Sequence, residues 1–103
     1  MSITELPIRI DREKVAEFCR ARGIRKLSLF GSVLRDDFDP ERSDVDVLAE
    51  FEPGALRGLG FRYFGYGDQL TEILGCRVDF FSRLSPHFDT AIRREALTIY
   101  ECP

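Results

Sequence analysis

Two stretches of the chain decide its fold: KLSLFGS at residues 26–32 and SDVDVLAEF at residues 43–51. The first favours an extended backbone and runs into a Gly-Ser pair, which is typical of a strand that meets a tight turn. In the second, the odd-numbered residues from 45 to 51 are apolar and share one face of a strand, while Asp46, Leu48 and Glu50 share the other face. The two stretches therefore predict neighbouring strands, one ending at a Gly-Ser turn and one beginning at a pair of aspartates.

Helix signals surround these strands. Asp11 is a good N-cap for a helix over residues 12–22, and Gly23 is a good C-terminal stop. Further elements are expected as a helix at 68–74, a strand at 77–82, a helix from 85 to about 97 that begins at a Ser-Pro pair, and a short edge strand at 98–100. Because helices alternate with strands, the sequence predicts an α/β (α+β) layer fold.

Length and composition limit the classes of function. The chain has 103 residues, so we expect one domain spanning 1–103. It carries 15 basic and 18 acidic residues, a net charge of -3, which argues against nucleic acid as a general partner. The three cysteines form no Cys-x-x-Cys motif, and no apolar run approaches the roughly 18 to 20 residues of a membrane span. We therefore expect a cytoplasmic protein with no membrane partner, and we expect its cysteines to be packing residues.

A pair of acids at the start of the second strand is the first candidate site. Asp44 and Asp46 are separated by one residue, so their side chains leave the strand on one face, roughly 7 Å apart at Cα. Converging carboxylates favour a shared proton or a hard cation such as Mg²⁺. The alternative is two solvated carboxylates at a strand end.

Three further features lie at the ends or flanks of the predicted strands. Gly31 and Ser32 offer close backbone approach, free N–H groups and a hydroxyl, as a phosphate cradle requires. Asp79 lies between apolar neighbours in the third strand, where an isolated carboxylate needs a partner. Arg35, just past the Gly-Ser turn, is a candidate for phosphate contact, with a surface role equally open.

Taken together, Leu29-Phe30-Gly31-Ser32, Ser43-Asp44-Val45-Asp46-Val47-Leu48 and Val78-Asp79-Phe80 closely resemble the motifs of the minimal nucleotidyltransferases, small relatives of the polymerase-β nucleotidyltransferase superfamily. The resemblance extends from about Asp11 to Glu101 and implies a nucleotidyltransferase fold, with a mixed β-sheet flanked by helices. It implies that Gly31 and Ser32 hold a triphosphate, that Asp44 and Asp46 bind Mg²⁺, and that Asp79 completes a second metal site or acts as base. The chain departs from many members by having Arg35-Asp36 where they have Arg-Gly.

Members of this family commonly pair with a HEPN-domain toxin. The resemblance therefore implies a nucleotidyltransferase, more narrowly a protein adenylyltransferase, that uses two Mg²⁺ ions to move AMP from ATP to a tyrosine hydroxyl of such a toxin. It would act as antitoxin of a type VII-like toxin–antitoxin module and form a hetero-oligomer with its partner. The alternative is a catalytically silent antitoxin that neutralises its partner by binding; a polymerase-like enzyme is disfavoured because the chain has no basic stripe. Phe61 and Phe64 are candidate partner contacts, unless a loop folds both into the core.

Overall fold

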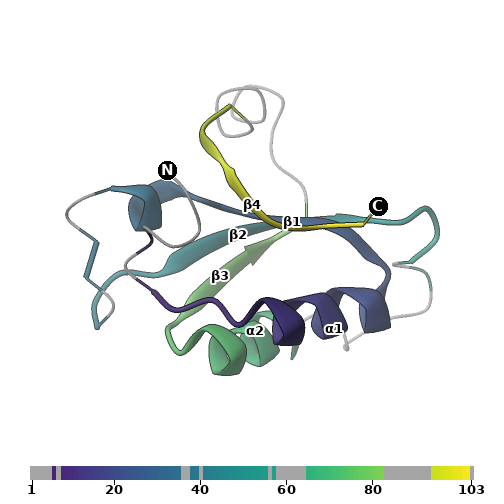
Figure 1. The fold of residues 1–103 in the computed structure, drawn as a ribbon, viewed down its shortest axis with the longest axis horizontal. Coiled ribbons are helices and arrows are strands. Elements are labelled where there is room, and N and C mark those ends of the chain that lie inside the picture. The colour runs from purple at the N-terminus through teal and green to yellow at the C-terminus, as the bar shows by residue number, and fades with distance from the viewer. Residues whose placement is uncertain are drawn as a thin grey trace.

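A computed structural model describes residues 6, 8–35, 38–39, 41–55, 57, 65–82 and 94–102. In these ranges a four-stranded sheet has both α-helices on one of its sides (Figure 1). The elements are, in chain order, α1 (Arg12–Arg22), β1 (Ile24–Phe30), the 3-10 turn η2 (Gly31–Leu34), β2 (Val45–Phe51), α2 (Tyr66–Leu74), β3 (Val78–Phe81) and β4 (Leu97–Glu101).

The sheet is mixed, as expected. Its strand order is β3-β2-β1-β4, with β1 antiparallel to both β2 and β4, and β3 parallel to β2. The parallel pair is possible because the chain between β2 and β3 includes α2, which crosses one face of the sheet. The mixed sheet and its helices confirm the predicted fold class.

Helix α1 matches the predicted residues 12–22. The Asp11 carboxylate accepts a hydrogen bond from the main-chain N–H of Lys14 at 3.2 Å, which satisfies one of the free donors of the first turn. Gly23 ends the helix in the left-handed conformation, with φ of 68°, and its N–H donates to the Cys19 carbonyl. Both caps are local signals, which is why the sequence predicts this helix correctly.

Helix α2 begins at Tyr66, two residues before the predicted start at 68. The ring of Tyr66 is buried and makes edge contacts with Phe18 and Phe80, with ring centroids 6.0 and 6.2 Å apart. Burial of an aromatic side chain outweighs the cost of about 1 kcal/mol for glycine in the first turn. The helix ends, as expected, at 74, followed by Gly75 with φ of 76°.

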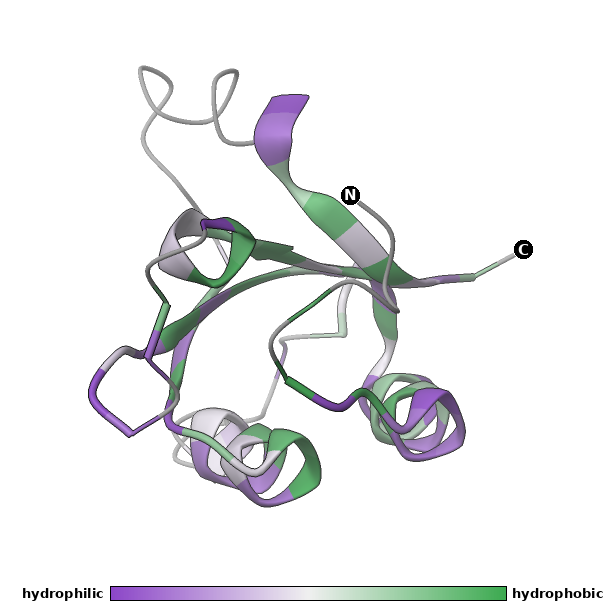
Figure 2. Ribbon diagram, turned by 60° about the vertical axis from the view of Figure 1, so that its left-hand side comes forward, coloured by the Kyte–Doolittle hydropathy of each residue, from purple (hydrophilic) through white to green (hydrophobic). Residues whose placement is uncertain are grey.

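The hydrophobic core lies between the helices and one face of the sheet. Each helix shows separate hydrophobic and hydrophilic sides (Figure 2). Alternation along β2 sends Val45, Val47 and Ala49 into this core, each with no exposed surface. Asp46 and Leu48 therefore lie on the opposite face of the sheet.

The other predicted strands are confirmed, but the last predicted helix is not confirmed at its C-terminal end. Strands 26–30, 77–82 and 98–100 correspond to β1, β3 and the edge strand β4 within two residues. The helix expected from 85 to about 97 lies mostly outside the described residues, but β4 already begins at Leu97, so the helix ends earlier than expected. Phe61 and Phe64 lie outside the described residues.

The cysteines do not all pack as expected. Cys19 and Cys76 are buried, but Cys102 is exposed, because it follows the edge strand β4 and the chain there has left the core. The expectation of a packing role is therefore wrong for Cys102. Among the described residues, no helix is both long enough and apolar enough to span a membrane.

Candidate active site

A row of residues across three strands places two acids side by side. In the sheet register, Phe30 of β1 is opposite Asp46 of β2, and Asp46 is opposite Asp79 of β3. Register partners in a sheet project to the same face, so Asp46 and Asp79 both lie on the face of the sheet opposite the helices. Asp44 comes one residue before β2 and two before Asp46. The structure therefore brings together three carboxylates that the chain separates by up to 35 residues.

The convergence of the acids affects the pKa of Asp46. Its pKa is raised above the ordinary value, first by burial, then by the negative charge of Asp79 and then by that of Asp44. Each of these causes destabilises the ionised form. A positive ion next to Asp46 would reverse the two charge effects, so the cluster favours a cation.

Gly31 lies directly against Asp46. The turn η2 begins at Gly31, whose φ of +77° is a left-handed conformation that other residues seldom adopt. A Cβ atom at this position would lie 2.2 Å from Oδ2 of Asp46. Glycine is thus required twice, by the backbone and by the carboxylate, and the Gly-Ser turn and the aspartates form one site.

Ser32 and Asp44 join the turn to the segment before β2. The Ser32 hydroxyl donates a hydrogen bond of 3.4 Å to the main-chain carbonyl of Asp44. The Asp44 carboxylate pairs with Arg77, the residue before β3, with Oδ1 3.1 Å from Nε. Asp44 is therefore contacted from the turn after β1 and from the residue before β3.

A cavity of about 460 Å³ includes Gly31 in its lining. Its basic groups are Arg35, which ends η2, and Arg94, which precedes β4; Gly31, Leu34, Glu95, Ala96 and Leu97 complete the lining. The cavity is large enough for a small ligand. Arg35 thus lies where the sequence places it, beside the Gly-Ser turn.

Sequence reasoning missed Arg94 and Arg77. The signal for Arg94 is the antiparallel pairing of β1 with β4, which puts Leu97 opposite Leu29 and carries the residues before 97 towards Gly31. The signal for Arg77 is its place before a strand parallel to β2, level with the aspartates. Both signals require the strand order, which the local sequence does not state.

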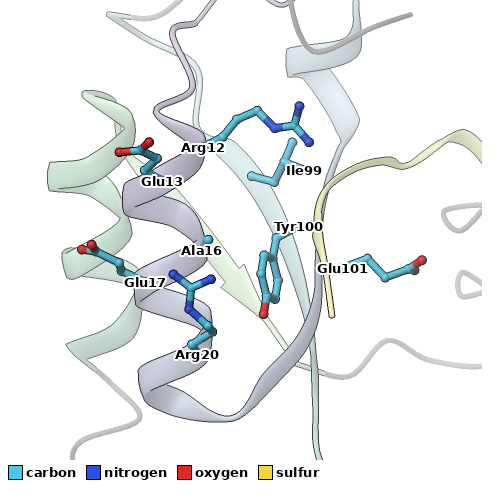
Figure 3. A pocket seen from close by; sticks show the side chains of 8 residues that line it. All are labelled: Arg12, Glu13, Ala16, Glu17, Arg20, Ile99, Tyr100 and Glu101. Atoms are coloured by element: carbon cyan, nitrogen blue, oxygen red, sulfur yellow. The ribbon is translucent and has the colours of Figure 1, made fainter. Parts of the chain in front are cut away.

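A second cavity, of about 470 Å³, lies between α1 and β4 (Figure 3). Arg12 and Arg20 face it together with Glu13, Glu17 and Glu101, so its charges are mixed. It shares no lining residue with the cavity beside Gly31. A polyanionic ligand therefore fits the Gly31 cavity better.

Metal binding by these residues can be judged from their donor atoms. Among the described residues, no group of three or more His, Cys, Asp and Glu side chains is arranged to hold a metal ion unaided. Asp44 and Asp46 nevertheless offer carboxylate oxygens, the ligands that Mg²⁺ prefers, and Mg²⁺ usually completes its octahedron with water and substrate phosphates. The donor set, together with the charge repulsion at Asp46, fits a divalent ion bound jointly with a phosphate ligand.

Comparison with known proteins agrees with this geometry. Residues 12–98 match the family described as "Nucleotidyltransferase domain". The chain belongs to the nucleotidyltransferase domain family. A solved structure provisionally described as a minimal nucleotidyltransferase is 36% identical to this nucleotidyltransferase domain, with a TM-score of 0.66, and the match covers 84% of this chain and 86% of that one. The resemblance to minimal nucleotidyltransferases is thereby confirmed.

Two more distant structures share the fold. One is described as a mutant of the toxin–antitoxin pair MntA-HpeT, at 13% identity and a TM-score of 0.63. The other is described as a toxin–antitoxin with AMP-PNP, at 15% identity and a TM-score of 0.67. Each match covers 90% of this nucleotidyltransferase domain and 75% of the other chain. A comparison with curated proteins finds no significant match.

Proposed function

We propose that this chain transfers a nucleoside monophosphate, AMP from ATP, to a tyrosine hydroxyl of a HEPN-domain toxin, and thereby acts as antitoxin of a type VII-like module. The observation that carries the proposal is the row in which Asp46 lies opposite Asp79 and against Gly31. It joins an acidic cluster to a phosphate-binding turn, which is the combination that transfer from a triphosphate requires.

Asp44 and Asp46 are the residues that would hold Mg²⁺, and Asp79, next to Asp46 in the row, would act as the base. The metal would neutralise charge on the phosphates and on the departing pyrophosphate. The backbone N–H groups at Gly31 and the hydroxyl of Ser32 would hold the phosphates next to the carboxylates.

The guanidinium groups of Arg35 and Arg94 extend the phosphate site. Both line the cavity beside Gly31, and guanidinium groups bind phosphate oxygens through paired hydrogen bonds. We assign the β- and γ-phosphates to this cavity, because they are the groups that leave as pyrophosphate and carry most of the negative charge.

In the proposed transfer the acceptor oxygen forms a bond to the α-phosphorus while the bond from the α-phosphorus to the bridging oxygen breaks. Pyrophosphate leaves with that electron pair. The proton of the acceptor hydroxyl passes to the carboxylate of Asp79, which lies in the row next to Asp46. No covalent intermediate with the chain is needed.

The partner assignment is supported by the two toxin–antitoxin structures with this fold. One of them is described with AMP-PNP, an ATP analogue, and the other as a mutant with two Asp-to-Glu changes two positions apart, the spacing of Asp44 and Asp46. An antitoxin that acts by binding alone is the second candidate. The convergence of Asp44 and Asp79 on Asp46 favours catalysis, because binding alone does not need a carboxylate whose ionised form two neighbouring negative charges destabilise.

Mass spectrometry of the toxin encoded beside this chain tests the proposal. Co-expression with the native chain should add one AMP to a toxin tyrosine, and the double variant Asp44→Ala, Asp46→Ala should abolish the addition. The matched control is Glu13→Gln with Glu17→Gln, two exposed acids of α1 outside the site, which should leave the addition intact. Inhibition of the toxin that survives in the double variant, without any modification by the native chain, would establish the binding model instead.

A further inference from the structure

Arg77 forms an ion pair with Asp44, one of the three acids of the candidate site. It immediately precedes β3, and its main-chain carbonyl accepts a hydrogen bond of 2.8 Å from the N–H of Val45. This bond starts the parallel pairing of β2 with β3. The side chain of Arg77 therefore leaves the chain level with Asp44.

The guanidinium makes two contacts with the segment before β2. Its Nε lies 3.1 Å from Oδ1 of Asp44, and its Nη2 donates a 2.6 Å hydrogen bond to the main-chain carbonyl of Arg42. The fork of the guanidinium thus fixes the orientation of the Asp44 carboxylate relative to the main chain. Both side chains of the pair are half-exposed, at 64% for Arg77 and 51% for Asp44.

An ion pair this exposed adds little to the stability of the fold. The pair also acts on the site, because the Asp44 charge that it offsets is one source of the repulsion at Asp46. The guanidinium offsets that charge and occupies one oxygen of a carboxylate that a metal ion would also use. Arg77 and a divalent ion therefore compete for Asp44.

We propose that Arg77 is the charge partner that sets the cation affinity of this site, by pairing with Asp44 until a metal ion arrives together with a nucleoside triphosphate. The inference rests on the proposed function, since it takes Asp44 and Asp46 as metal ligands. A triphosphate supplies the negative charge that offsets both the guanidinium and the ion. The pairing thus makes the metal bind weakly alone and more tightly with nucleotide, which is a coupling between two ligands.

Binding of Mn²⁺ to the 103-residue chain, followed by the electron paramagnetic resonance signal of the ion, tests the proposal without any enzymatic readout. Arg77→Met removes the charge and keeps a chain of similar length. A unit charge about 6 Å from a divalent ion in a water-like dielectric changes its affinity about tenfold. We therefore expect Arg77→Met to bind Mn²⁺ about tenfold more tightly than the native chain without nucleotide, and to gain less on addition of AMP-PNP.

Two variants separate this effect from others. Arg77→Lys keeps the charge and should bind Mn²⁺ like the native chain. Arg25→Met changes the net charge equally but lies at the far end of β1, about 16 Å along the strand from Phe30, so its affinity should stay within about twofold of the native value. Tighter binding in Arg25→Met to the same extent would overturn the specific pairing.

The failure of this inference is distinguishable from the failure of the proposed function. If Mn²⁺ binds the native chain and Asp44→Asn with Asp46→Asn removes the binding, but Arg77→Met binds no more tightly, only the role of Arg77 is refuted. If Mn²⁺ binds the double aspartate variant with the same affinity as the native chain, the metal ligands are misassigned and both proposals fail.

Discussion

Substitution of Gly31 by alanine should lower activity strongly, with no greater loss of stability than alanine causes at another glycine of the same backbone conformation. The new Cβ would lie 2.2 Å from Oδ2 and 3.2 Å from Cγ of Asp46, whereas real Cβ contacts of this kind begin at 3.0 Å. The backbone at Gly31 is fixed at the end of β1 and the start of η2, so the end of the flexible aspartate side chain must move. The carboxylate is therefore displaced by about 1 Å, an error that lowers a rate by roughly 100-fold when it affects a reacting geometry.

The stability cost of this substitution has a different origin. A non-glycine residue in the left-handed conformation costs roughly 1–2 kcal/mol. Gly75→Ala is a matched control, because its φ of +76° is nearly the same as the +77° of Gly31 and no atom lies within 4 Å of the Cβ position. Both variants should lose about 1–2 kcal/mol of unfolding free energy, since the displaced carboxylate rotates at little cost.

Urea denaturation and the proposed AMP transfer to the toxin are measured on both variants. We expect similar losses of stability, a fall in transfer of about 100-fold in Gly31→Ala, and a rate within about threefold of native in Gly75→Ala. Equal activity in the two variants would refute the claim that Gly31 positions Asp46. A loss of stability in Gly31→Ala several kcal/mol beyond that in Gly75→Ala would show instead that the backbone moves and not the carboxylate.

Three further measurements test other parts of the molecule. Asp44→Asn with Asp46→Asn should raise the melting temperature of the metal-free protein slightly, by removing repulsion, and should abolish the rise on adding Mg²⁺; an unchanged Mg²⁺ response would exclude metal binding there. Arg22→Met should lower the unfolding free energy by about 1 kcal/mol, because the Arg22 guanidinium lies 4.1 Å from the centre of the Phe18 ring and donates a hydrogen bond to the Phe18 carbonyl. An unchanged urea denaturation curve would show that these contacts add no stability. Iodoacetamide at pH 8 should label exposed Cys102 but not Cys19, whose pKa burial raises to about 12. Because that pKa lies above the ordinary thiol value of 9.0, the stability contributed by the neutral Cys19 thiol is complete below pH 9 and is lost as the pH rises through about 12. Labelling of Cys19 at pH 8 would refute its burial.

Most of the fold follows from local signals in the sequence. Helix α1 has a cap at each end, and β2 shows an unbroken alternation of apolar and other residues, so both match the prediction residue for residue. The early start of α2 at Tyr66 escaped prediction because it depends on aromatic partners from α1 and β3, which only the packed structure brings together.

The residues of the candidate site also fall into two groups, those that a local motif predicts and those that it does not. Gly31 and Asp46 could be recognised because each belongs to a short motif with its own chemistry. Arg77 and Arg94 belong to no motif, and their place at the site depends on the parallel pairing of β3 with β2 and the antiparallel pairing of β4 with β1. Non-local pairings of this kind determine which side chains meet, and they cannot be read from local patterns in the sequence.

The register of β2 explains how a chain this small tolerates a repulsive acidic cluster. Val45 and Val47 are fully buried on the helix side, and Asp46 between them projects to the other face. A slip of one residue would place the carboxylate in the apolar core and both valines outside it, at a cost far above that of the repulsion at the site. The apolar residues that stabilise the sheet therefore also hold Asp46 opposite Asp79, and no separate structural element is needed to position the acids. A cation bound at this end of the sheet would relieve the repulsion between the carboxylates, which the packing of β2 already tolerates.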